Sequence, residues 1–421
     1  MQIRLLKLNQ ADANPPLLNK NMIYLDNSAT TKQYDQVTDL MVQCMEEDFG
    51  NPSSLYQLGV DSEKILKKAR KQVMDALGHG GTKDFSKSGS LIFTSGGTEA
   101  DNMAIFGTAK ALRRAGNRIV TTAVEHPAVL ECCKSLEQDG FEVVYVGVDS
   151  KGCLDMQQLA NAINDKTILV SIMHVNNESG TIMPIDDVRA IMDEKGAPGL
   201  LHCDAVQSFC KLSMPQKADL IAISGHKING PKGSGALWIA NKAGNGRNIN
   251  LPALICGGGQ ETGKRSGTEN VPALAGLGLA AELSAWDQED DMQRIGEMRE
   301  QLKEGLLEAI PDIRINSPQE IGYEAGLCCP SILSVSFTGT RGEVLLHTLE
   351  QYSIYVSTGS ACSSNKKGQS HVLMAMGLKD KEIEGTIRFS LGRFNTKEEI
   401  DEAIEKTAVA VERFRLLGSF R

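Results

Sequence analysis

Residues 219–227 read DLIAISGHK, a near-continuous apolar run that ends in the polar tetrapeptide SGHK. Such runs, rich in β-branched residues, are typical of strands that are buried on both faces of a parallel sheet. Six further short apolar runs occur, at residues 90–96, 118–126, 141–149, 167–175, 200–205 and 235–240. The sequence therefore predicts a sheet of seven buried strands.

Helical patterns lie between several of these runs. In the stretch 62–78, apolar residues recur at helical spacing and the pattern stops at Gly78; the stripe consists of Ile65, Leu66, Ala69, Val73 and Leu77. Alternating strands and helices indicate an α/β domain with a mostly parallel sheet. We place this large domain at residues 37–284.

The alternation of apolar runs and helical patterns changes after about residue 285. A long charged helical stretch runs to about Ala309, and two further strand-like runs follow at 331–337 and 386–392. Thr396 and Glu399 have the spacing of a capping box. We expect residues 22–36 and 285–421 to form a smaller α+β domain. Residues 1–21 are interpreted as a loose extension, or as lying ahead of a true start at Met22.

Composition excludes several classes of function. The net charge of −9 argues against a surface for nucleic acid or anionic membrane, and no run approaches the length of a membrane-spanning helix. The ten cysteines form no CxxC motif, so no metal site is expected. Cys203, Cys210, Cys256, Cys328 and Cys329 are interpreted as packing residues. Reduced thiols in the cytoplasm are the expected state.

Polar residues crowd just past several strand ends, where open α/β sheets bind their ligands. Lys227 ends one run and is suited to form a Schiff base, since desolvation lowers the pKa of a lysine. Asp204 closes another run, and its carboxylate is suited to hold a pyridine nitrogen protonated. Gln207 follows three residues later, in reach of a ring hydroxyl. An N-cap role remains the alternative for Asp204.

Two more strand ends complete the pattern. TSGGTEADN, at residues 94–102, has glycines and Thr98 ahead of helical residues, which predicts a phosphate cradle at a helix N-terminus. His126 ends the run 118–126 and is suited to stack on a ring or to move protons, although a structural histidine is the alternative. Together these ends predict a site for pyridoxal phosphate.

The sequence resembles the cysteine desulfurases of the NifS/IscS type, which belong with the class V aminotransferases to the fold-type I pyridoxal-phosphate enzymes. The resemblance runs from residue 24 to the C-terminal helix. Its landmarks, in chain order, are YLDNSATT, TSGGTEADN, EHPAV, NNESGT, HCDAVQ, SGHKINGPKGSGAL, GGGQETGKRSGTEN, TGSACSS and RFSLGRFNT. The implied fold is that of the PLP-dependent transferases of fold type I.

The resemblance implies a role for each matching position. Lys227 would bind the cofactor covalently and move the Cα proton of the substrate, while His126 would stack on the ring. Asn177 and Arg388 would hold the substrate carboxylate, with Arg393 as the rival arginine. Thr268 would reach the phosphate of the other subunit, which implies a homodimer. The remaining cofactor-binding residues would be Gly97, Thr98, Asp204, Gln207, Ser224 and His226.

Cys362 lies in the hydrophilic stretch 357–371, STGSACSSNKKGQSH, where a structural cysteine is not expected. Such a loop has little to bury and is expected to move. The resemblance implies that Cys362 takes the sulfur of L-cysteine as a persulfide, leaving L-alanine, and that the loop delivers it to an acceptor protein. That acceptor would serve iron–sulfur cluster assembly or tRNA thiolation.

The rival interpretations are other enzymes of the same fold and a protein without catalytic activity. A selenocysteine lyase or a class V aminotransferase would use the same site, but an aminotransferase would not need Cys362. A catalytically idle sulfur-relay protein is disfavoured because Lys227, Asp204 and Cys362 are all present.

Overall fold

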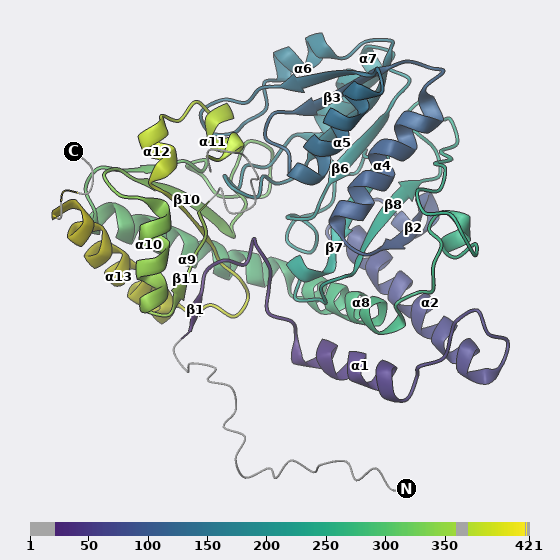
Figure 1. The fold of residues 1–421 in the computed structure, drawn as a ribbon, viewed down its shortest axis with the longest axis horizontal. Coiled ribbons are helices and arrows are strands. Elements are labelled where there is room, and N and C mark those ends of the chain that lie inside the picture. The colour runs from purple at the N-terminus through teal and green to yellow at the C-terminus, as the bar shows by residue number, and fades with distance from the viewer. Residues whose placement is uncertain (1–21, 359–368, 417, 419–421) are drawn as a thin grey trace, which may run out of the picture.

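A computed structural model describes residues 22–358, 369–416 and 418 of the chain. Two bodies of secondary structure lie side by side, and each is built around its own sheet (Figure 1). The first body contains the seven predicted strands. The second is smaller and combines the chain's beginning with its last third. Among the described residues, no helix is long and apolar enough to cross a membrane.

The large sheet confirms the predicted seven strands and their mostly parallel arrangement. Four of its neighbouring pairs are parallel, and only β8 runs antiparallel to its two neighbours. In spatial order the strands are β2 (Gly89–Thr94), β8 (Gly235–Ala240), β7 (Leu220–Ser224), β6 (Leu200–Asp204), β5 (Thr167–Met173), β3 (Arg118–Thr122) and β4 (Glu142–Val146).

The central strands are apolar on both faces because helices cover both sides of the sheet. In β7, Ile221 and Ile223 belong to one core cluster, whereas Leu220 and Ala222 belong to another. The helices of this body are α1 (Asp35–Glu46), α2 (Gln57–Gly78), α3 (Phe85–Ser88), α4 (Gly97–Leu112), α5 (Pro127–Gln138), α6 (Met156–Ala162), α7 (Ile185–Glu194) and α8 (Val271–Trp286). The helix predicted over 62–78 is confirmed, and α2 ends at Gly78.

The smaller body contains an antiparallel sheet and a two-stranded parallel pair. The sheet has the order β12 (Thr386–Ser390), β10 (Ile332–Phe337) and β9 (Ile313–Ile315), and the pair joins β1 (Ile23–Tyr24) to β11 (Ile354–Tyr355). Its helices are α9 (Gln288–Ala309), α10 (Gly342–Gln351), α11 (His371–Ala375), α12 (Asp380–Glu384) and α13 (Lys397–Leu416). The short strands β1, β9 and β11 were not predicted.

Separate apolar cores stabilise the two bodies. The core of the smaller one takes Ile23 and Leu25 from the start of the described chain and Leu302 from α9. The capping box before α13 is confirmed, since Glu399 N lies 3.3 Å from Thr396 Oγ1 and Thr396 N lies 3.2 Å from Glu399 Oε2. These cores support the division near residues 36 and 285 in part, because Val372, Leu373 and Ile383 of α11 and α12 belong to the core of the large body. The division itself stays a prediction.

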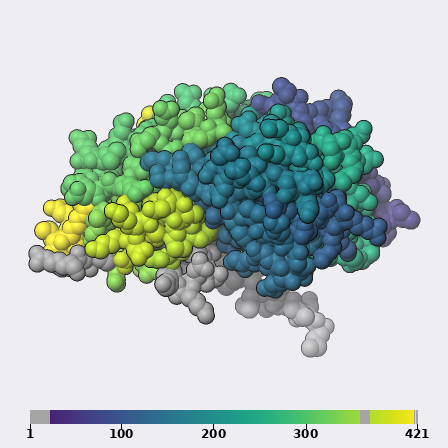
Figure 2. Space-filling model, turned by 90° about the horizontal axis from the view of Figure 1, so that it is seen from above, coloured from purple at the N-terminus to yellow at the C-terminus, as the bar shows by residue number. Residues whose placement is uncertain are grey.

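The two bodies pack directly against each other, and the yellow-green segment that contains α11 and α12 abuts the blue part of the chain (Figure 2). The carboxyl ends of β3, β5, β6 and β7 share one edge of the large sheet because these strands are parallel. Strand β12 brings Arg388 to the same edge from the smaller body, as the cavity described below shows.

We predict that the buried pair of Arg189 and Asp219 stabilises the opposite end of β6 and β7. Both side chains are buried, and Asp219 Oδ2 also accepts a hydrogen bond from Leu201 N at 2.8 Å. Asp219→Ala removes the buried partner of the guanidinium and leaves only the exposed Asp193 at 3.6 Å. Urea unfolding monitored by circular dichroism should therefore show a loss of about 3 kcal/mol in the free energy of unfolding.

The exposed pair of Lys134 and Glu131 provides the matched control, since Lys134→Ala should cost at most about 1 kcal/mol. Equal losses in the two variants would contradict the prediction.

Candidate active site

A cavity of about 240 Å³ opens at the carboxyl edge of the large sheet, and it gathers most of the predicted site residues. They arrive from five strand ends of the large sheet and from β12 of the smaller body. Those that line the cavity are Gly97, Thr98, His126, Asn177, Asp204, Gln207, Ser224, His226, Lys227 and Arg388. Residues far apart in the sequence therefore meet at one place.

Lys227 ends a 3₁₀ turn, Gly225–Lys227, that directly follows β7. Its Nζ donates hydrogen bonds to the carbonyl oxygen of Ala29, at 2.8 Å, and to that of Ser28. Both acceptors belong to the turn that follows β1, so an N-terminal segment fixes the amine at the edge of the cavity.

Asp204 is buried at the end of β6, where its Oδ1 accepts a hydrogen bond from Val206 N at 2.9 Å. Burial raises the pKa of its carboxyl to about 6, and the nearby Lys227 cation opposes that shift. A further positive group in the cavity would stabilise the ionised carboxylate.

Gln207 lies on the same side of the cavity and is anchored at one end. Its Nε2 donates to the carbonyl oxygen of Ser28 at 2.9 Å. Its Oε1 is buried and has no hydrogen-bond partner among the described residues. A buried amide oxygen without a partner is costly, so a ligand atom in the cavity is the natural partner.

The glycine-rich segment after β2 leads straight into α4, which begins at Gly97. A Cβ atom on Gly97 would lie 2.6 Å from Val206 Cγ2, so a side chain does not fit there. The N-terminus of this long helix carries unpaired N–H groups and a positive dipole end, and both favour an anion. Thr98 and Ser224 supply hydroxyl groups along the same wall.

His126 caps α5 and also lines the cavity. Its Nδ1 accepts a hydrogen bond from Ala128 N at 3.1 Å, so the structural and functional interpretations are compatible. Burial, followed by the Lys227 cation, lowers the pKa of its imidazole to about 4. The ring is therefore neutral near pH 7, and with Nδ1 accepting, its proton sits on Nε2.

Arg388 and Arg393 lie in different environments. Arg388 lines the cavity, where its NH1 donates to the carbonyl oxygen of Asn177 at 2.9 Å and its NH2 pairs with Asp26 Oδ1 at 2.7 Å. Its buried Nε has no hydrogen-bond partner among the described residues. Arg393 lies outside the cavity and pairs with Asp287 and Asp291. The geometry thus favours Arg388 as the ligand-facing arginine.

Two predicted residues remain to be placed, Thr268 and Cys362. Thr268 is exposed and is absent from the walls of the cavity. Cys362 lies outside the described residues. The described chain stops beside the cavity, because Ser357 exchanges backbone hydrogen bonds with Arg388, at 3.2 Å and 2.7 Å.

The prediction for the other cysteines holds with one exception. Cys203, Cys210, Cys328 and Cys329 are buried, but Cys256 is exposed, so its interpretation as a packing residue is wrong. Its neighbours Leu254 and Ile255 are exposed too, so this segment lies on the surface. No cluster able to hold a metal ion occurs in the described residues.

Sequence reasoning missed the turn that follows β1. Ser28 and Ala29 line the cavity and hold Lys227, and Asp26 holds Arg388. The motif YLDNSATT was the available signal, but its partners are about two hundred or more positions away in the chain. Asp101 also lines the cavity, and burial, aided by the charge of Asp204, raises the pKa of its carboxyl.

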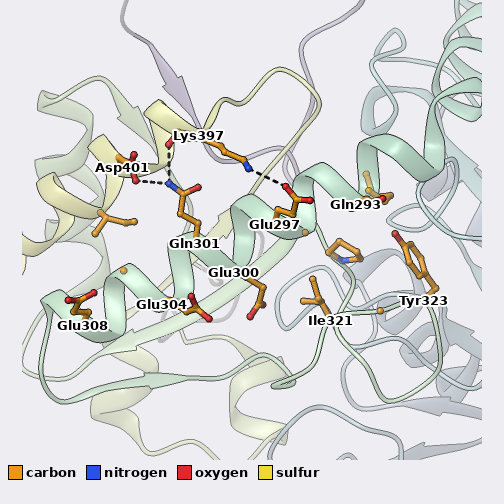
Figure 3. A pocket seen from close by; sticks show the side chains of 16 residues that line it. Gln293, Glu297, Glu300, Gln301, Glu304, Glu308, Ile321, Tyr323, Lys397 and Asp401 are labelled. Atoms are coloured by element: carbon orange, nitrogen blue, oxygen red, sulfur yellow. Dashed lines mark hydrogen bonds and ion pairs between the residues drawn. The ribbon is translucent and has the colours of Figure 1, made fainter.

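A larger hollow of about 880 Å³ lies on the smaller body, along α9 and α13 (Figure 3). It contains none of the predicted site residues. Its carboxylates are partly paired, as Lys397 bonds to Glu297 at 3.2 Å and Gln301 to Asp401 at 2.6 Å. We therefore assign the candidate site to the smaller cavity at the sheet edge.

Comparison with known proteins agrees with this geometry. The model of the family described as aminotransferase class V matches residues 23–403. A curated cysteine desulfurase IscS from Methanosarcina thermophila is 42% identical over 93% of each chain. A cysteine desulfurase from Nostoc sp. is 40% identical over 95% of this chain and 96% of its own.

Solved structures give the same relationship. A NifS-like protein matches with a TM-score of 0.83 and 36% identity, over 93% of this chain and 100% of its own. A structure of SspA in complex with cysteine matches with a TM-score of 0.72 and 32% identity, over 89% of this chain and 100% of its own. The chain therefore belongs to the class V aminotransferase family of pyridoxal-phosphate-dependent enzymes, in the branch whose curated members are cysteine desulfurases.

Proposed function

We propose that this chain is a pyridoxal-phosphate-dependent cysteine desulfurase that converts L-cysteine to L-alanine and takes the sulfur as a persulfide on Cys362. The observation that carries the proposal is the meeting of Lys227, Asp204 and Arg388 around one cavity. These residues supply an amine, a carboxylate and a guanidinium, in a family whose curated relatives are named for this reaction.

The cavity fits the cofactor by the chemistry of its walls. The unpartnered Gln207 Oε1 offers a bond to a ring substituent, and Asp204 offers a carboxylate for a ring nitrogen. Gly97, Thr98, Ser224 and His226 would hold the phosphate, with the α4 N-terminus behind it. When bound at Lys227, pyridoxal phosphate supplies the electron sink that stabilises negative charge at the substrate's Cα.

Arg388 would bind the substrate carboxylate. Its guanidinium is held on two sides, by Asn177 and Asp26, and its unpartnered Nε faces a buried environment. A fixed, planar guanidinium matches a carboxylate and orients the Cα–H bond toward Lys227. Asn177, which also lines the cavity, would complete this subsite.

Lys227 and His126 would handle the protons. The carbonyls of Ser28 and Ala29 keep Lys227 Nζ at the cavity wall, where it would take the Cα proton of the substrate. His126 is neutral, so its Nε2–H would be available to donate to the substrate, and its ring would face the bound cofactor.

The Cys362 thiolate would then attack the sulfur of bound cysteine. A new S–S bond forms, the substrate's Cβ–S bond breaks, and its electron pair stays with the carbon fragment, which becomes alanine after protonation. Cys362 is four positions after Thr358, so the chain between their Cα atoms can span at most about 14 Å.

Further parts of the proposal concern partners. Exposed Thr268 is suited to reach the phosphate of a second subunit, so we propose a homodimer. The persulfide would pass to an acceptor protein for iron–sulfur cluster assembly or tRNA thiolation. The described cysteines form no disulfide, which supports a cytoplasmic location. The alternative activities are those of a selenocysteine lyase or an aminotransferase.

Cys362→Ser should retain the cofactor's absorbance but lose alanine formation from cysteine, because serine cannot accept the sulfur. Alanine released per subunit is the measurement, with Cys256→Ser as the control for an exposed thiol away from the cavity. Full activity of Cys362→Ser would contradict the proposal. Activity on selenocysteine alone would indicate the lyase.

Arg388→Lys should raise the KM for cysteine by at least about tenfold, because an ammonium cannot replace a planar guanidinium at a carboxylate. Arg393→Lys is the matched control on the same segment and should change KM little. Steady-state kinetics of both variants decide between the arginines, and a larger effect at Arg393 would reverse the assignment.

The imidazole of His126 should stay neutral from pH 5 to 8 in the cofactor-free protein, since burial lowers its pKa to about 4. Its charge therefore changes only as the pH falls toward that value. Nitrogen-15 NMR of labelled histidines, with His126→Gln to assign the signal, tests this. A midpoint near the ordinary value of 6.5 would refute it.

A further inference from the structure

Ser370 and Glu178 form a buried hydrogen bond at the point where the described chain resumes after residue 368. The hydroxyl of Ser370 donates to Glu178 Oε2 at 2.6 Å and accepts from Leu373 N at 3.1 Å, at the start of α11. The two residues are only 1% and 4% exposed. A short bond from a hydroxyl to a buried carboxylate is among the stronger hydrogen bonds in proteins.

Glu178 belongs to a rigid turn beside the substrate subsite. Its backbone N–H donates to Asn176 Oδ1 at 2.9 Å, and Asn176 Nδ2 donates to the carbonyl oxygen of Val124 at 3.0 Å. The preceding residue, Asn177, accepts the hydrogen bond from Arg388. Burial raises the pKa of the Glu178 carboxyl to about 7, while the Ser370 bond and the Arg388 cation oppose the shift.

A second contact holds the same end of the chain. His371 Nε2 donates to the carbonyl oxygen of Glu125 at 2.9 Å, directly before His126. Val372 and Leu373 of α11 then join the apolar core of the large body, where Figure 1 shows α11 at the junction of the two bodies. At the other end, Ser357 is bonded to the backbone of Arg388.

We propose that Glu178 and Ser370 are positioning residues for sulfur transfer: their hydrogen bond fixes where the chain that carries Cys362 rejoins the fold. The proposal rests on the proposed function. It gives Glu178 and Ser370 a role in sulfur transfer that is separate from binding of the cofactor or the substrate. Removal of the Cα proton by Lys227 does not use this bond. Attack of the Cys362 thiolate on the substrate sulfur depends on it, with the same bonds forming and breaking as above.

The test separates these two steps. Persulfide on Cys362 is followed by quenched mass spectrometry during a single turnover with L-cysteine. Exchange of the Cα hydrogen of cysteine with deuterated solvent is followed by NMR in a Cys362→Ser background, where sulfur transfer cannot follow. Ser370→Ala should slow persulfide formation by about tenfold, the loss expected when a buried hydrogen bond is broken and its partner is left unsatisfied. Exchange should keep its rate, and KM should not rise.

Three further variants make the test specific. Ser370→Thr keeps the hydroxyl and should restore transfer. Glu178→Gln keeps an acceptor for the Ser370 hydroxyl but removes the negative charge, so it should slow transfer less than Ser370→Ala does. The double variant Glu178→Gln/Ser370→Ala should be no slower than Ser370→Ala, because both changes act on the same bond. Ser370→Asp keeps a helix-capping side chain but places a second carboxylate against Glu178, so it should be at least as slow as Ser370→Ala.

Several results would overturn the inference. One is sulfur transfer at the wild-type rate in Ser370→Ala. Another is a wild-type rate in Ser370→Asp, which would mean that Ser370 acts only as a helix cap. A third is a loss of Cα-hydrogen exchange as large as the loss of sulfur transfer. Thermal unfolding of each variant identifies a general loss of structure. If the wild-type protein itself forms no persulfide, the proposed function fails, and this inference falls with it.

Discussion

The contact between the Lys227 amine and the carbonyls of Ser28 and Ala29 is the interaction on which the rest of the site depends. The turn at residues 26–31 supplies both acceptors, and it bonds to both bodies of the molecule. Gln207 donates to Ser28 from the large body, and Ser28 N donates to Ser390 Oγ in the smaller one. The turn thus determines how the cavity walls meet.

The same turn explains why the substrate subsite belongs to two bodies. Asp26 pairs with Arg388, which β12 carries, and Arg388 bonds in turn to Asn177 of the large body. The guanidinium is therefore preorganised before any ligand arrives. Burial raises the pKa values of three carboxyl groups around the cavity: Asp204, which lines it, Glu125, which directly precedes His126, and Glu178, which directly follows Asn177. Cationic groups of a bound ligand would favour the ionised form of these carboxyl groups.

The sequence predicted the large sheet well, because its strands are apolar runs whose composition alone distinguishes them. It also predicted the side chains at the strand ends, since parallel strands bring them to one edge. It did not predict β1 and β11, which have only two residues each and are stabilised by distant partners. The roles of Asp26, Ser28 and Ala29 depend on contacts with residues far away in the chain, which no local pattern encodes. The choice between Arg388 and Arg393 required the fold, because only Arg388 lines the cavity.

The central claim is that sulfur moves from cysteine to Cys362. Its most direct measurement is tandem mass spectrometry of the Cys362 peptide after the holoenzyme reacts with one equivalent of L-cysteine, with alanine quantified in the same sample. The account predicts a gain of one sulfur atom on Cys362, matched by one alanine per modified subunit. Alanine formed while Cys362 stays unmodified, or sulfur found on another cysteine, would contradict it.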